Sequence, residues 1–141
     1  MFRRVSDTAF VSPQIELEDV AAAKAAGIAM IVNNRPDGED PSAAQGADVE
    51  AAAEALGLDY LAIPVGHAGF SEPQIDQMIN ALAGATGPVL AYCRSGTRST
   101  LLWALAQAKL GKEPGEIAQM AIAAGYDVSP IRPMLDVLAA R

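Results

Sequence analysis

Apolar residues in this chain form short runs that alternate with longer segments of helical character. Most runs are continuous and bounded by residues such as glycine, proline or asparagine, which is typical of strands buried in a sheet. The five predicted strands span residues 2–5, 9–11, 28–32, 60–65 and 89–92. The remaining segments predict helices at residues 16–26, 43–56, 71–85, 100–110, 114–124 and 131–141.

The alternation of strands and helices predicts a single α/β domain, residues 1–141, with a mainly parallel central sheet. Ligands bind such sheets at the carboxyl ends of the strands. Three loops are expected at those ends, and they follow Val32, Val65 and Tyr92. We therefore expect one functional site, formed where the three loops converge.

The loop after the last predicted strand contains most of the candidate chemistry. Its sequence, CRSGTRS at residues 93–99, precedes a helix that is apolar nearly all round and is expected to be buried. A strand–loop–helix arrangement gathers backbone N–H groups and directs the positive end of the helix dipole toward one point. Gly96 allows backbone angles closed to other residues, and Arg94 and Arg98 add two positive charges. The pattern predicts an oxyanion-binding loop with a thiol at its base.

Cys93, the only cysteine of the chain, is the candidate nucleophile. A helix N-terminus and two guanidinium groups favour the thiolate, which is the reactive form of cysteine. The alternative is a small buried residue without chemical function. Packing alone gives no reason for two arginines and two hydroxyl groups in the five residues that follow Cys93, so we favour the catalytic interpretation. The residues expected to bind the substrate are Arg94, Ser95, Gly96 and Thr97.

Composition narrows the classes of function. Hydrophobic residues make up 51% of the 141 residues and charged residues 19%, which excludes a disordered chain. The net charge of −7 argues against nucleic acid as a partner, because nucleic-acid binding needs a basic face. No apolar run approaches the ~20 residues of a membrane span, so no membrane association is expected. The arginines at positions 3 and 4 are not followed by the apolar core of a signal peptide.

The chain has too few cysteine and histidine residues for an internal disulfide or a Cys/His metal site. A single cysteine cannot form an internal disulfide, which makes a cytoplasmic location the default. One cysteine and one histidine form no cluster of metal ligands, and we expect neither a metal nor a cofactor. The expected ligand is a small anion, recognised by a positive loop that is a local exception in an acidic protein.

Three segments appear together in a known family. They are IVNNRPDGE at residues 31–39, YLAIPV at residues 60–65 and YCRSGTRS at residues 92–99. In this order they resemble the bacterial family called beta-lactamase-hydrolase-like, phosphatase-like domain. Members of that family are also described as sulfur transferases, and some are fused to persulfide dioxygenases. The resemblance covers nearly the whole chain.

The resemblance implies a three-layer αβα fold similar to that of the protein-tyrosine and dual-specificity phosphatases. It also implies that Cys93 is the nucleophile and that Arg98 clamps the anion. Ser99 matches a hydroxyl that supports the thiolate or the leaving group. The strand that ends at Val65 matches one that leads to an aspartate general acid in dual-specificity phosphatases, but His67 occupies that position here.

The loop also departs from the phosphatase pattern. Four residues separate Cys93 from Arg98, whereas the phosphatase loop has five. A shorter loop closes a smaller ring of N–H donors, and Cys-Arg-Ser-Gly-x-Arg-Ser is very similar to the loop of single-domain rhodaneses, which hold a persulfide. We therefore predict a sulfurtransferase that takes sulfur from thiosulfate or a low-molecular-weight persulfide onto Cys93, with a persulfide dioxygenase as a candidate partner.

Two alternatives belong to other classes of function. The first is a phosphatase that hydrolyses phosphate monoesters through a phosphocysteine on Cys93. Its leaving group needs a proton, for which His67 and Asp37 are candidates. The second is a module that binds an oxyanion without turnover.

Other polar loop residues have two interpretations each. His67 is either an acid of the site or a loop residue that only makes hydrogen bonds. Arg35 and Asp37 are either rim residues of the site or part of a turn at Pro-Asp-Gly. Glu39 and Asp40 are expected to form a solvated acidic loop.

Overall fold

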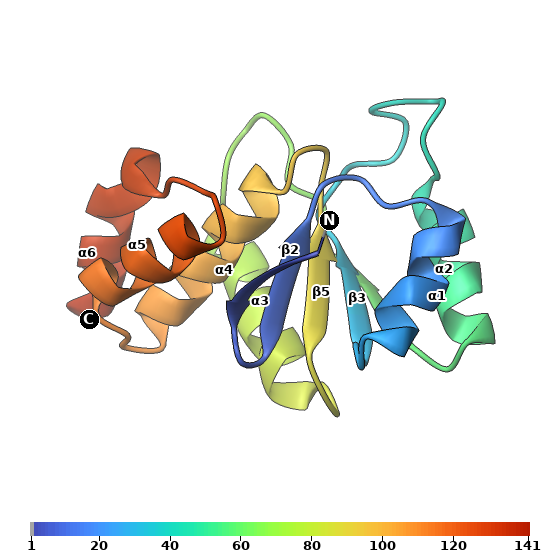
Figure 1. Ribbon diagram of the computed structural model, residues 1–141. Helices are drawn as coiled ribbons and strands as arrows, with labels where there is room; N and C mark the ends of the chain where they lie inside the picture. The colour runs from blue at the N-terminus through green and yellow to red at the C-terminus, as the bar shows by residue number, and fades with distance from the viewer. Residues whose placement is uncertain (1) are drawn as a thin grey trace.

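A five-stranded sheet runs through the centre of the protein in the computed structural model, which describes residues 2–141 (Figure 1). The strands are β1 (Arg3–Ser6), β2 (Ala9–Ser12), β3 (Met30–Asn33), β4 (Asp59–Ala62) and β5 (Val89–Tyr92). Their order across the sheet is β1-β2-β5-β3-β4. β1 pairs with β2 in antiparallel fashion, and all other neighbours are parallel. The prediction of a mainly parallel sheet is confirmed, and β5 lies at its centre.

Helices cover both faces of the sheet. They are α1 (Leu17–Ala25), α2 (Gly46–Ala55), α3 (Glu72–Gly84), α4 (Thr97–Lys109), α5 (Pro114–Ala123) and α6 (Arg132–Ala139), with a short 3-10 turn, η1 (Ser129–Ile131). Figure 1 shows α1 and α2 on one side of the sheet and the other helices on the opposite side. The three-layer αβα architecture is therefore confirmed.

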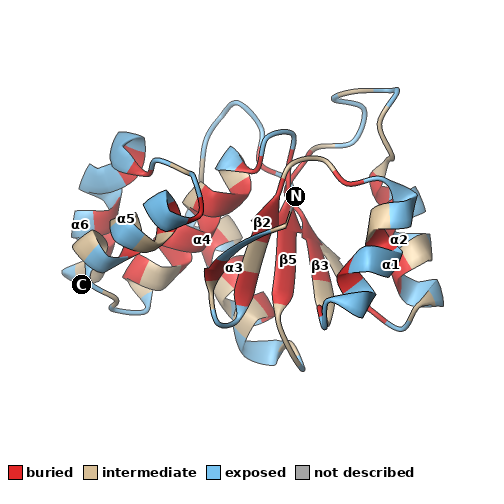
Figure 2. Cartoon of the chain, in the orientation of Figure 1, coloured by how far each residue is buried: buried red, intermediate tan, exposed pale blue. Residues whose placement is uncertain are grey.

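Helix α4 is surrounded by the other helices of its layer and by the sheet. It packs against α3, α5 and α6 as well as against β5 and β2. Trp103 and Leu105 are completely buried, and Figure 2 shows α4 as the most continuously buried helix of its layer. The all-round apolar pattern predicted this burial, because a helix without a polar face has no side that water can solvate. The helix that follows Cys93 is thus fixed from several directions.

Two predicted boundaries were wrong beside the candidate site. The helix predicted from residue 43 begins at Gly46, because the Asp37 carboxylate accepts the Gly46 N–H at 3.0 Å and the Gln45 side chain accepts the Gly38 N–H at 2.8 Å. The strand predicted through Val65 ends at Ala62, because its partner β3 ends at Asn33. Both shifts lengthen the loops that surround the site.

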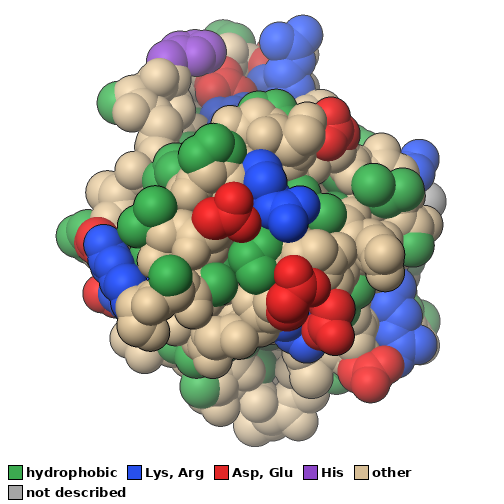
Figure 3. All heavy atoms as spheres, turned by 90° about the vertical axis from the view of Figure 1, so that its left-hand side faces the viewer, with side chains coloured by type: hydrophobic (Ala, Val, Ile, Leu, Met, Phe, Trp, Pro, Cys, Tyr) green, Lys and Arg blue, Asp and Glu red, His purple; other side chains and the backbone are tan. Residues whose placement is uncertain are grey.

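The surface outside the site is mixed in charge. Lys109 of α4 pairs with Glu72 and Asp76 of α3, and Arg141 also reaches Glu72. Figure 3 shows the end of the molecule that α5 and α6 form, where basic and acidic side chains lie among apolar ones. No helix within residues 2–141 has both the length and the apolar character that crossing a membrane requires.

Candidate active site

The loops that follow β3, β4 and β5 meet at one edge of the sheet, as the alternation of strands and helices predicted. Arg98, in the first turn of α4, connects all three. Its Nη1 donates to the carbonyl oxygen of Val65 at 2.7 Å and to Glu39 Oε2 at 2.9 Å, and its Nη2 donates to Glu39 Oε1 at 2.7 Å. The site is therefore built from segments far apart in the sequence.

Cys93 is the first residue after β5 and is completely buried. Its Sγ accepts the N–H of Gly96 at 3.1 Å, and its own N–H donates to the carbonyl oxygen of Ser12 at 3.3 Å. Gly96 has φ +90°, a left-handed conformation that other residues rarely adopt. Because α4 begins at Thr97, the sulfur lies at the positive end of a 13-residue helix. An N–H donor and the positive end of a helix dipole thus meet at the sulfur.

The hydroxyl groups of the loop are bonded to each other. Ser95 Oγ donates to Thr97 Oγ1 at 3.0 Å and accepts the Thr97 N–H at 3.3 Å. These side chains, predicted to bind the substrate, therefore stabilise the start of α4 in this structure. The backbone N–H groups of Arg94, Ser95 and Arg98 make no hydrogen bond within residues 2–141, so they remain available to an oxyanion.

Arg94 lies at the rim of the site. Its side chain is exposed, and its carbonyl oxygen accepts the N–H of Gln14 at 3.1 Å. The pKa of Asp40 lies below its ordinary value, mainly because Ser42 donates hydrogen bonds to the carboxylate, with smaller contributions from the charges of Arg35 and Arg94. Arg94 therefore adds positive charge at the mouth of the site and is free to meet a ligand.

Ser99 connects α4 to β3. Its hydroxyl donates to Asn34 Oδ1 at 2.7 Å, and both residues are completely buried. Asn34 in turn donates from Nδ2 to the carbonyl oxygen of Ile63 at 3.0 Å. The family resemblance implied a hydroxyl that supports the thiolate or the leaving group. Here the hydroxyl hydrogen is directed to Asn34, so Ser99 fixes the position of α4 on the sheet.

Sequence reasoning missed the contacts that Glu39 makes at the site. Its side chain is only 22% exposed and lies between two arginines, accepting from Arg98 and, at 2.8 Å, from Arg35 Nε. The hydrogen bond from Arg98 is the main cause that lowers the pKa of Glu39 to about 2, with Arg35 adding to it and burial opposing it. Glu39 as a whole is an exposed residue of an acidic loop, as expected, but its carboxylate is held by both arginines. The four-residue spacing from Arg35 was the only signal in the sequence.

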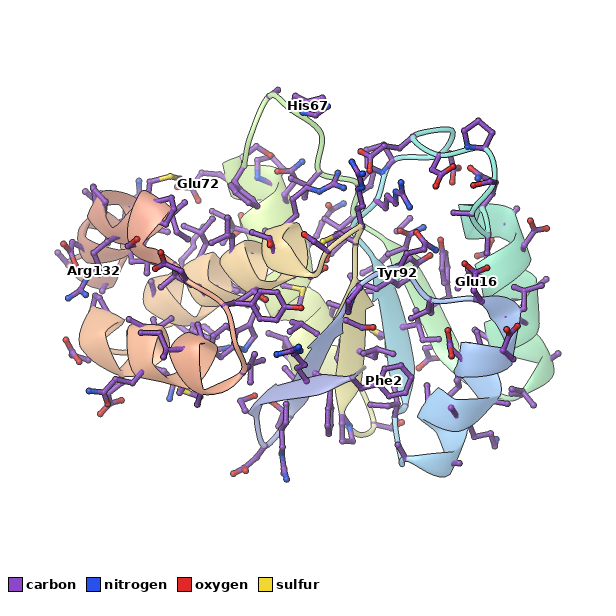
Figure 4. The ribbon with its side chains drawn as sticks, turned by 45° about the horizontal axis from the view of Figure 1, so that its top comes forward. Phe2, Glu16, His67, Glu72, Tyr92 and Arg132 are labelled. Carbon is purple, nitrogen blue, oxygen red and sulfur yellow. The ribbon has the colours of Figure 1, made fainter. Side chains whose placement is uncertain are left out.

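The two candidate acids of the sequence analysis lie elsewhere. The Asp37 carboxylate binds the start of α2, as described above. His67 is exposed at the tip of the loop after β4 and projects away from the body of the protein (Figure 4). Within residues 2–141, neither side chain forms a hydrogen bond with the loop of residues 93–98. The structure therefore brings Arg35 to the site but places neither Asp37 nor His67 on Cys93.

Tyr126, beyond the end of α5, supports the cysteine loop from outside. Its hydroxyl donates to the carbonyl oxygen of Ser95 at 3.0 Å and lies against Gly96, leaving no room for a Cβ at that position. Arg3 of β1 stacks on the Tyr126 ring at 5.8 Å and donates to the carbonyl oxygen of Ala124 at 3.0 Å. No local pattern in the sequence predicted this contact.

No group of three or more His, Cys, Asp or Glu side chains that could hold a metal ion occurs in the described part of the chain.

The ion pairs of Glu39 predict a pH-dependent stability. Because the folded-state pKa of about 2 lies below the ordinary 4.5, the contribution to stability is complete above pH 4.5 and is lost as the pH falls toward 2. Glu39→Gln should therefore lower the free energy of unfolding by about 1–2 kcal/mol at pH 7, and the difference should shrink toward zero near pH 2. Urea titrations at several pH values measure this. A difference independent of pH, or the same trend in Glu54→Gln on exposed α2, would contradict it.

Comparison with known proteins identifies the family. Residues 1–110 match the model of the family described as beta-lactamase hydrolase-like protein, phosphatase-like domain. The chain belongs to this family. A beta-lactamase hydrolase-like protein from Agrobacterium fabrum is 32% identical over 126 residues, which are 89% of this chain and 29% of that protein. The chain thus spans less than a third of the curated relatives that it matches. The family resemblance found in the sequence is confirmed.

Solved structures similar to this member of the beta-lactamase hydrolase-like, phosphatase-like family are phosphatase-like. The crystal structure of a candidate phosphatase from Neisseria meningitidis is 31% identical, with a TM-score of 0.85 over 96% of each chain. A TpbA variant from P. aeruginosa, solved in complex with pTyr, is 18% identical and shares the fold, with a TM-score of 0.70 over 99% of this chain and 88% of that one. These comparisons support a cysteine-dependent enzyme of protein-tyrosine-phosphatase-like fold. They favour the hydrolase alternative and give no support to sulfur transfer or to a persulfide dioxygenase partner.

Proposed function

We propose that this protein hydrolyses phosphate monoesters through a phosphocysteine on Cys93. The observation that supports this most directly is the arrangement around the sulfur, which combines the Gly96 N–H, the N-terminus of α4 and the adjacent Arg98 guanidinium. Together with the free backbone N–H groups, these donors match a phosphoryl group bearing two negative charges. The 31% identity to the Neisseria meningitidis protein is consistent with this chemistry.

The reaction divides into two displacements. The Cys93 thiolate attacks phosphorus, forming the S–P bond while the bond from phosphorus to the ester oxygen breaks and its electron pair leaves with the alcohol or phenol. A water molecule then displaces the sulfur, releasing inorganic phosphate and the thiolate. In both steps Arg98 and the backbone N–H groups stabilise charge on the equatorial oxygens.

The site favours substrates with acidic leaving groups. Neither Asp37 nor His67 forms a hydrogen bond with the cysteine loop within residues 2–141, and the Tyr126 hydroxyl is directed to the Ser95 carbonyl oxygen. Glu39 is ionised at neutral pH because its pKa is about 2. A phenolate leaves without proton transfer far more readily than an alkoxide does. We therefore propose aryl phosphates as the substrate class, in preference to alkyl phosphates.

Sulfur transfer is the second candidate, and one observation favours it. Only four residues separate Cys93 from Arg98, and the sulfur donors expected for such a loop need no general acid. In that reaction the thiolate would attack the outer sulfur of thiosulfate, releasing sulfite and leaving a persulfide on Cys93. Cyanide would then take the outer sulfur as thiocyanate and regenerate the thiolate.

A paired assay on one preparation tests the proposal. One arm measures p-nitrophenol released from p-nitrophenyl phosphate, with phosphoserine as the alkyl comparison, and the other measures thiocyanate formed from thiosulfate and cyanide. We expect turnover of the aryl phosphate at least about tenfold above the alkyl phosphate, and none in the second arm. Turnover in the second arm alone would reject the phosphatase in favour of sulfur transfer. No turnover in either arm, with phosphate still bound, would favour the non-catalytic module.

A further inference from the structure

We infer that Glu39 is a positioning residue that orients Arg98 for oxyanion binding. This inference rests on the proposed function only in requiring that the ligand is an oxyanion held beside Cys93. Glu39 itself need not touch the ligand, because it acts through the guanidinium group that it binds. The argument depends on which of the five N–H donors of Arg98 are already occupied.

The contacts of Arg98 divide its guanidinium into two sides. Glu39 binds the end of the guanidinium, where its Oε1 accepts from Nη2 and its Oε2 accepts from Nη1. The second hydrogen of Nη1 is donated to the Val65 carbonyl oxygen. Three donors are thus used. Within residues 2–141 no oxygen accepts the Nε–H or the second hydrogen of Nη2. These two donors lie side by side, in the arrangement that binds two oxygens of one phosphate or carboxylate.

Arg98 interacts with Cys93 as well as with Glu39. The pKa of Arg98 lies above its ordinary value, first because of the hydrogen bond with Glu39 and further because of interactions with Cys93. An anion bound at the Nε–H and Nη2 pair would therefore lie beside the nucleophile. Glu39 and the Val65 carbonyl together fix the rotation of the guanidinium that makes this possible, since each binds a different edge of the planar group.

Glu39 is itself held in place. Arg35, only 9% exposed, donates from Nε to Glu39 and from Nη1 to Gln14 Oε1, both at 2.8 Å. Gln14 also donates its backbone N–H to the carbonyl oxygen of Arg94 in the cysteine loop. A chain of contacts thus runs from the Arg94 carbonyl oxygen through Gln14, Arg35 and Glu39 to Arg98, and both of its ends belong to the segment of residues 93–98. It therefore fixes the carboxylate relative to the atoms that bind the ligand.

Two other roles for Glu39 predict different results. As a general acid it would need a proton at neutral pH, which its low pKa opposes, and its removal would eliminate the basic limb of the pH–rate profile. As an internal competitor of the substrate it would occupy the donors that bind the ligand, and its removal would tighten phosphate binding. A positioning residue leaves the limbs of the profile in place and weakens phosphate binding when it is removed.

The variants that test this are Glu39→Gln, which keeps the shape and removes the charge, and Glu39→Asp, which keeps the charge but shortens the reach. Asp40→Asn is the matched control for charge, because it removes the same charge from the neighbouring residue. The Asp40 carboxylate binds Ser42 and lies 4.0 Å from Arg35 Nη2, but it does not bind Arg98. Circular dichroism and thermal unfolding confirm that each variant is folded before it is compared.

The first measurement needs no ligand. The ¹⁵N relaxation of the Arg98 Nε–H, assigned by its absence in Arg98→Lys, reports how rigid the guanidinium is. We expect it to be ordered in the wild type and in Asp40→Asn, and flexible in Glu39→Gln. An equally ordered side chain in Glu39→Gln would overturn the inference, whether or not the protein hydrolyses phosphate esters.

The second measurement uses the ligand. With inorganic phosphate as the probe, titration calorimetry should show binding weakened about tenfold in Glu39→Gln, by an intermediate factor in Glu39→Asp and by less than twofold in Asp40→Asn. KM for p-nitrophenyl phosphate should rise in parallel, with the shape of the pH–rate profile unchanged from the wild type. Tighter phosphate binding in Glu39→Gln, or a pH–rate profile of different shape, would overturn the inference. If wild-type protein binds phosphate without turnover, the proposed function fails and the inference is still decided.

Discussion

Replacing Cys93 with serine should abolish hydrolysis of p-nitrophenyl phosphate, lowering kcat by about 10⁴-fold or more. The serine hydroxyl stays protonated in the environment that favours a thiolate, so the nucleophile is lost while the loop remains. The Gly96 N–H and the other donors of the loop are unchanged by the substitution, and the smaller oxygen fits where the sulfur was buried. Steady-state release of p-nitrophenol measures the effect.

The same variant separates catalysis from binding. Cys93→Ser should still bind inorganic phosphate in a calorimetric titration, because the donors to the anion come from Arg98 and the backbone. Its thermal unfolding should remain cooperative, which would exclude loss of the fold as the cause. Residual turnover above about 1% of the wild-type rate would mean that another group attacks phosphorus, and the phosphocysteine mechanism would then be wrong.

Replacing Arg98 with lysine should lower kcat/KM by about 10²–10³-fold. Lysine retains the positive charge but has neither the planar pair of donors for two phosphate oxygens nor the three contacts that orient the side chain. Because the transition state has more charge on the equatorial oxygens than the substrate, kcat should fall as well as the affinity. Initial rates over a range of substrate concentrations separate the two effects.

Arg132→Lys is the matched control for this change. Arg132 begins α6 on the far side of the molecule and pairs with Asp136 four residues later (Figure 4), so its replacement should leave kcat/KM within twofold. If Arg98→Lys also stayed within tenfold of the wild type, charge alone would be sufficient. The two-oxygen contact described above would then have no part in catalysis.

Much of the fold could be predicted because its signals are local. The apolar run Val89–Tyr92 forms β5 with the predicted bounds, and the all-round apolar helix behind the loop is buried as expected. The helix predicted over residues 71–85 forms as α3, and a capping box of Ser71 and Gln74 begins it. The cysteine loop was also found correctly, since strand, loop and helix are contiguous there.

The remaining part of the site depends on contacts between distant residues. Glu39 meets Arg98 across 59 residues and Tyr126 meets Ser95 across 31, and neither separation has a period that a sequence pattern can reveal. Asp37 had the residue type of an acid, but its carboxylate binds the first N–H of α2, where a helix dipole stabilises negative charge. Residue type suggested the chemistry, whereas the partner of each side chain decided its role.

The contact between Tyr126 and the cysteine loop bears on how far this chain can be shortened. The match to the family model ends at residue 110. The cysteine loop within it nevertheless contacts the side chain of Tyr126, sixteen residues further along the chain. A cut at the motif boundary would remove α5 and α6 and uncover the faces of α4 that pack against them. A shortened form of this unit is therefore expected to need α5, Tyr126 and α6 to keep the cysteine loop supported.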